Sequence, residues 1–185
     1  MWTYLSTWIV QDGELPELRA GSRLIDHGVR ASGWLIESTR DTDRLEFVEG
    51  PDPDGYDTVT YRLTGPVEWS RPETSEWVIR CEGIPFLARL SNLYPVPRRI
   101  GERVSVLCAL AVVPDYEWLA FGLPDVRQDW IVEALKVQRR AVEVRDGTGV
   151  PADVVCVEEL VEMRQWADGR AGLACEYLLD LRRAG

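Results

Sequence analysis

The sequence has almost no histidine or lysine, and it lacks the short motifs that mark several common enzyme classes. His27 is the only histidine and Lys136 the only lysine among 185 residues. The patterns Gly-x-x-x-x-Gly-Lys, Gly-x-Gly-x-x-Gly, His-Glu-x-x-His and Gly-x-Ser-x-Gly do not occur. A catalytic pair with serine or cysteine would need His27, and its neighbour Asp26 would point to the opposite face of a strand. These absences favour a non-enzymatic protein without excluding an enzyme.

Cysteine is also sparse, and its spacing does not fit a metal site. Cys81, Cys108, Cys156 and Cys175 are all more than four residues apart, with no Cys-x-x-Cys pair. Zinc sites draw their ligands from closely spaced pairs, so we expect no metal and no cofactor. Three of the four cysteines fall in phase with apolar residues of predicted strands. We therefore expect free, reduced thiols, as is usual for a protein that is not secreted.

Long apolar segments are missing as well. The longest apolar run, Leu107–Pro114, is the length of a strand, whereas a membrane-spanning helix needs about 18 or more apolar residues. The segment Met1–Tyr4 has neither the basic nor the apolar region of a secretory signal. We expect a cytoplasmic protein that does not contact a membrane.

The charge is strongly acidic and unevenly distributed. There are 31 acidic and 21 basic residues, giving a net charge of −10. Residues 58–142 are near neutral, with 10 acidic and 11 basic residues, and both flanks are acidic. Phosphates would be repelled at long range, so we expect no binding to duplex DNA. An acidic surface suits a basic protein partner, and self-association is the other alternative.

An alternation of apolar and polar residues is the main structural signal. From Thr58 onward it predicts successive strands, and another over the segment 172–183. Residues 2–10, 22–38 and 44–48 also read as strands. The segment 129–145 fits a helix or a strand, and we favour a strand through Val137. The predicted core positions are Trp77, Ile79, Cys81, Phe86, Val104, Val106, Cys108, Leu110, Tyr177 and Leu179.

One segment, residues 153–166, predicts a short helix. Asp153 is a candidate cap, a stripe of Val157, Leu160 and Val161 follows, and Gly169 would end the helix. The fold class is therefore mainly β, an antiparallel small barrel or a two-sheet sandwich with this one helix. We expect a single domain over residues 1–185, with a barrel core over 58–142 flanked by 1–57 and 143–185.

The order of elements in residues 58–142 resembles an OB-fold, a five-stranded barrel with a long, bent first strand. Thr58 to Trp69 would be that first strand, with its bend at Gly65. Trp77 to Glu82 and Ile84 to Leu90 would form the next hairpin, and Gly101 to Val113 the fourth strand. Trp130 to Val137 would be the fifth strand. The resemblance covers less than half of the chain.

Basic and aromatic residues near these strands are the candidate binding residues. They are Trp69, Tyr94, Arg98, Arg99, Arg103 and Trp118, with Arg139 and Arg140 close by in the sequence. The leading hypothesis is a non-enzymatic protein-interaction or binding module on a β-barrel. One alternative is a small-molecule or enzymatic pocket lined by Trp and Arg. The other is an OB-type binder of single-stranded nucleic acid, which would stack bases on the aromatic rings.

Overall fold

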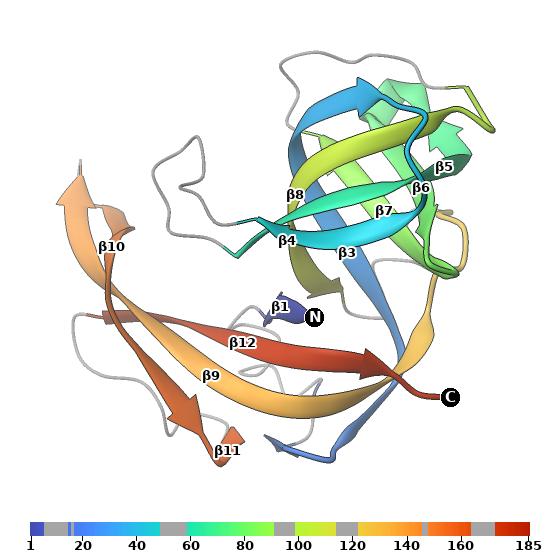
Figure 1. Cartoon of the computed structure of the whole chain (residues 1–185). Helices are drawn as coiled ribbons and strands as arrows, with labels where there is room; N and C mark the ends of the chain where they lie inside the picture. The colour runs from blue at the N-terminus through green and yellow to red at the C-terminus, as the bar shows by residue number, and fades with distance from the viewer. Residues whose placement is uncertain are drawn as a thin grey trace. The chain divides into compact units, whose positions relative to one another are not determined.

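β-Strands make up nearly all the regular structure in the computed structural model, as the alternating sequence predicts (Figure 1). The structure describes residues 1–5, 15, 17–48, 59–90, 99–113, 122–145, 148–163 and 173–185. The described residues contain a single helical element, the 3-10 turn Pro72–Thr74. The chain divides into two compact units. The first comprises Met1–Ile25, Pro51–Asp57 and Gln128–Gly185, and the second comprises Asp26–Gly50 and Thr58–Arg127.

Five strands of the second unit close into a ring. β3 (Arg23–Ser38) pairs antiparallel with β8 (Arg103–Val113) and parallel with β7 (Ile84–Leu90). β8 also pairs with β5 (Thr60–Arg71), β5 with β6 (Glu76–Cys81), and β6 with β7, all antiparallel. Closing a sheet on itself removes the exposed edges of the strands that form the ring. This ring is the small barrel that the sequence predicts.

Apolar side chains fill the interior of the second unit. Alternation along a strand sends every second residue to the same face, which here is the core face. All eight core residues predicted in this unit are buried, and so are Tyr177 and Leu179 in the first unit. The eight are Trp77, Ile79, Cys81, Phe86, Val104, Val106, Cys108 and Leu110. The phases predicted for these strands are confirmed.

On the edge of β5 that does not face β8, the partner strand changes from β4 to β6 at Gly65, where the sequence predicts a bend. Thr60 to Thr64 pair with β4 (Arg44–Val48), and from Val67 onward β5 pairs with β6. A Cβ added at Gly65 would lie 1.9 Å from the carbonyl oxygen of Arg80. Only glycine allows the two backbones to approach so closely.

The fifth strand of the ring differs from the one expected. Its position between β7 and β8 is occupied by β3, which precedes β5 in the chain. The segment Trp130 to Val137 is a strand, as favoured, but it lies in the sheet of the first unit. The expected limits 58–142 therefore omit one strand of the ring. The two segments have similar β patterns, and sequence alternation alone does not specify a distant pairing partner.

The first unit contains a four-stranded antiparallel sheet. Its order is β10 (Thr148–Leu160), β9 (Gln128–Arg145), β12 (Leu173–Arg183) and β1 (Trp2–Leu5). One face of this sheet buries Trp130, Val132, Leu135 and Val137 of β9 together with Tyr177, Leu179 and Leu181 of β12. The regular alternation of β12 accounts for this face, because positions 177, 179 and 181 point the same way.

The helix predicted over residues 153–166 is wrong. Apart from the bend at Val161, its described residues belong to β10 and to β11 (Glu162–Met163), which pairs with β2 (Leu18–Arg19). Residues 164–166 and Gly169 lie outside the described residues. Val154, Val155 and Val157 favour strands, since their branched side chains lose freedom in a helix. Pairing with the long strand β9 adds a ladder of hydrogen bonds that outweighs the apolar stripe of helical spacing.

Candidate functional site

Three of the six candidate binding residues are placed by the structure, and all three belong to the second unit. Trp69 lies on β5, Arg103 begins β8, and Arg99 is exposed just before β8. Tyr94, Arg98 and Trp118 lie outside the described residues. The structure therefore shows the surroundings of half of the set.

Trp69 is half-buried and contacts other parts of its own unit. It packs, with Leu123, against a small apolar cluster formed by Val78, Leu87, Val113 and Val126. The guanidinium carbon of Arg71 lies 5.3 Å from the centre of the indole ring, within the range of a cation–π contact. Arg71 also donates a hydrogen bond to the carbonyl oxygen of Gly122, at 3.0 Å. Arg71 thus already lies over the indole ring on which a base would stack.

Arg103 is bound within the second unit. Its Nε and Nη2 atoms donate to the carbonyl oxygen of Asp41 at 2.9 and 2.6 Å, and Nη2 also contacts the Asp43 carboxylate at 2.5 Å. Charge-assisted hydrogen bonds of this kind fix a side chain in one orientation. The role shown for Arg103 is to hold the connection between β3 and β4 against the start of β8.

Two adjacent arginines on β9 are buried in the first unit. The side chains of Arg139 and Arg140 are 5% and 2% exposed. Neighbours on a strand point to opposite faces, so each has its own carboxylate: Glu158 lies 3.5 Å from Arg139, and Glu176 lies 3.2 Å from Arg140. The sequence suggests a surface role for both, because their burial depends on tertiary packing.

β10 lies at one edge of the sheet in the first unit. In the described part of the chain it pairs with β9 alone (Figure 1). Register shifts interrupt the pairing between Pro151 and Cys156, and the ladder is regular from Cys156 to Leu160. A strand at a sheet edge presents a row of main-chain donors and acceptors on its outer side. Cys156–Leu160 is therefore the regular part of this edge, and we call it the β10 edge.

The side chains near the β10 edge combine exposed valines with carboxylates. Val157 is 51% exposed and Val161 is 91% exposed. Glu159 is also exposed, and no ion pair of Glu159 occurs among the described residues. The segment 148–163 contains four acidic residues, Asp153, Glu158, Glu159 and Glu162, and no basic residue. In the sequence, apolar residues at helical spacing hide this edge, although the valines of the segment are a signal for a strand.

Cys81 and Cys108 are buried thiols in the ring of the second unit. Burial raises the pKa of Cys108 to about 12, and the nearby Cys81 adds to the effect. Burial also raises the pKa of Cys81 to about 12, with a further contribution from the charge of Glu82. Such thiols remain protonated at neutral pH and are poor nucleophiles. Neither has the properties of a reactive cysteine.

We predict that the second unit loses stability at alkaline pH through these two thiols. An unfolded thiol has a pKa near 9 and the folded ones about 12, so folding favours the protonated form. Their contribution to stability is complete below pH 9 and decreases as the pH rises toward 12. Denaturant midpoints at pH 8 to 10.5 should fall, and Cys108→Ala, although less stable, should show a shallower fall. Equal slopes for the two proteins would contradict this assignment.

The other two cysteines, Cys156 on β10 and Cys175 on β12, lie in the first unit. Cys156 and Cys175 pair with Arg139 from opposite sides of β9. Their backbones are thus two strand spacings apart, roughly 10 Å, which exceeds the reach of a disulfide. Thiol labelling of the unfolded, unreduced chain should therefore count four free thiols.

Three further searches, for a metal site, for a membrane-spanning helix and for related proteins, do not indicate a function. Within the described ranges, no group of three His, Cys, Asp or Glu side chains is placed to hold a metal ion. The same ranges contain no helix with the length and apolar character needed to cross a membrane. Comparisons with protein-family models, curated proteins and solved structures find no match.

Proposed function

We propose that this chain is a non-enzymatic interaction module that binds a basic, extended segment of a partner protein along the β10 edge. The observation that carries the proposal is that β10 is acidic and, within the described ranges, pairs with β9 alone. A peptide can add to such an edge as a further strand, with main-chain hydrogen bonds giving affinity and side chains giving specificity. No cofactor is needed for this function.

The protection of β10 against strand addition is incomplete. Proteins block sheet edges with proline, with bulges and with charged residues, especially lysine. Pro151 and the register shifts that follow it protect the first half of β10 in this way. The regular stretch Cys156–Leu160 has no such irregularity, and its charges are all negative. Negative charge deters acidic or identical strands but attracts a basic one.

Electrostatics favour a basic partner over a nucleic acid. The net charge of −10 would accelerate the approach of a positively charged segment and slow the approach of a polyanion. Arg71, which lies over the Trp69 ring, and the candidate residue Arg103 are already engaged: Arg71 with Gly122, and Arg103 with Asp41 and Asp43. These contacts leave less positive surface for phosphates in the second unit.

The test is binding of a labelled, unstructured peptide rich in lysine and arginine, measured by fluorescence anisotropy. Glu159→Lys should weaken binding about tenfold, which corresponds to roughly 1.4 kcal/mol. Glu73→Lys is the matched control, because Glu73 is exposed on the 3-10 turn of the second unit. It changes the net charge equally and should alter affinity less than about threefold.

Two results would count against the proposal. Equal weakening by Glu73→Lys and Glu159→Lys would show attraction to net charge alone, with no site at β10. Full affinity of a peptide N-methylated at alternate residues would show that main-chain pairing is not used, since N-methylation removes the donors of one ladder.

A further inference from the structure

Building on the proposed function, we infer that the β10 edge recognises a segment with two adjacent basic residues flanked by apolar ones. The four residues that would recognise this pattern are Val157, Glu158, Glu159 and Leu160. They are consecutive, and all lie within the regular ladder with β9. The pattern follows from which face of the sheet each side chain occupies.

The register with β9 assigns these positions to faces. Val157 pairs with Gln138 and Glu159 with Lys136, so these two share one face. Glu158 pairs with Val137 and Leu160 with Leu135 on the other face. Directly opposed residues of neighbouring strands lie on the same face, with Cβ atoms about 4.5–5.5 Å apart. An added strand would therefore place one residue beside each of the four.

Each of the four positions selects its neighbour by chemistry. The carboxylates of Glu158 and Glu159 favour lysine or arginine opposite them, and Val157 and Leu160 favour apolar side chains. The complementary segment is apolar, basic, basic, apolar. Because Val-Glu-Glu-Leu has the same chemical order in both directions, the pattern is satisfied by a parallel or an antiparallel segment. The two basic side chains would lie on opposite faces of the sheet.

The two carboxylates are not equivalent. The carboxylate of Glu158 lies 3.5 Å from the buried guanidinium of Arg139, which already offsets part of its charge. Glu159 lies opposite Lys136, whose ammonium is 4.7 Å from the centre of the Trp2 ring. Glu159 is the more exposed residue of the two, although the side chain of Glu158 is still 38% exposed. The basic residue opposite Glu159 should therefore contribute more affinity than the one opposite Glu158.

A second copy of this chain is a poor occupant of the same edge. A two-fold axis keeps each residue on its own face of the sheet, so antiparallel pairing of two identical segments centred on this stretch would set Glu158 against Glu158 or Glu159 against Glu159. A pair of like charges would then face each other at the axis, which is destabilising. The charges of β10 therefore point to a foreign, basic segment.

The experiment compares three peptides of one composition in identical neutral flanks. The first contains Val-Lys-Arg-Leu, the second Leu-Arg-Lys-Val, and the third Lys-Val-Leu-Arg. The first two should bind within about threefold of each other, and the third about tenfold more weakly. In the Glu159→Lys protein, glutamate is placed at each basic position of Val-Lys-Arg-Leu in turn, and the replacement that lies opposite position 159 should recover affinity while the other should not. That swap tests the pairing itself, and the Arg139–Glu158 contact is left intact.

The possible failures are distinguishable. Equal binding of all three peptides, with Glu159→Lys still weakening each, would overturn the pattern while leaving the proposed function standing. No binding of any peptide would overturn both. A dimer in sedimentation at high salt that dissociates when Val157→Pro disrupts the edge would assign the edge to a second copy and overturn the inference.

Discussion

Replacing Gly65 with alanine should destabilise the second unit by about 3 kcal/mol or more, among the larger effects expected of a single substitution. The added Cβ would lie 1.9 Å from the Arg80 carbonyl oxygen, 2.8 Å from the Arg80 carbonyl carbon and 3.3 Å from the Ile79 side chain. Two of these three atoms belong to backbone, so no side-chain rotation relieves the overlap. The β5 and β6 strands would have to separate where β5 changes partner.

Chemical denaturation of the full chain measures this effect. The control is Glu68→Ala, three residues further along β5, which removes an exposed ion pair with Arg80 and should cost less than about 1 kcal/mol. A Gly65→Ala protein within 1 kcal/mol of the original would show that β5 and β6 do not approach so closely.

The ring of the second unit was largely predictable because its strands alternate. Interior positions of a closed small barrel repeat with a period of two, so the phases of Trp77, Phe86 and Val106 follow from the sequence. Gly65 was also predictable, since glycine in a strand marks a bend or a close approach. The fifth strand was not. β3 and the segment Trp130 to Val137 have similar patterns, and only long-range pairing distinguishes them.

The candidate site was less predictable than the fold. In 153–166, apolar residues at helical spacing compete with the strand preference of the β-branched valines, and the partner strand that decides the outcome is distant in sequence. The burial of Arg139 and Arg140 could not be predicted from the sequence either, because a pair of adjacent arginines normally indicates an exposed surface. The β10 edge depends on the order of strands in the sheet, which alternation does not encode.

The second large effect concerns β12. A chain ending at Asp168 should be insoluble, or compact without cooperative unfolding. In the sheet of the first unit, β12 lies between β9 and β1 and pairs with both. The deletion would therefore remove the central partner of two strands as well as the side chains of β12.

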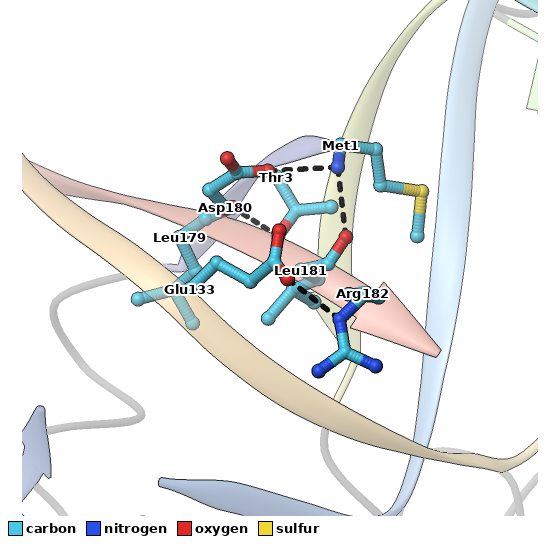
Figure 2. Close-up of polar contacts among 7 residues, drawn as sticks. All are labelled: Met1, Thr3, Glu133, Leu179, Asp180, Leu181 and Arg182. Atoms are coloured by element: carbon cyan, nitrogen blue, oxygen red, sulfur yellow. Dashed lines mark hydrogen bonds and ion pairs between the residues drawn. The ribbon is translucent and has the colours of Figure 1, made fainter. Parts of the chain in front are cut away.

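Contacts around the end of β12 show how firmly it is held (Figure 2). The amino group of Met1 donates to the Asp180 carboxylate at 2.8 Å and to the Leu181 carbonyl at 2.7 Å. The hydroxyl of Thr3 donates to the Leu179 carbonyl at 3.2 Å. Arg182 contacts the Glu133 carboxylate of β9 at 2.6 Å. Main-chain and side-chain bonds thus join β12 to both neighbours.

The size of the effect follows from the buried side chains of β12. Tyr177, Leu178, Leu179 and Leu181 are all 5% exposed or less. Burying each large apolar side chain contributes roughly 1.5–3 kcal/mol, so losing four approaches the net stability of a whole domain, roughly 5–15 kcal/mol. The control is a chain ending at Arg183, which keeps β12 and should unfold as the full chain does. A soluble chain of residues 1–168 with one cooperative transition would show that the first unit does not need β12. Near-ultraviolet circular dichroism and urea titration of the three proteins distinguish these outcomes, because loss of fixed packing around Trp130 on β9 would remove its contribution to the spectrum.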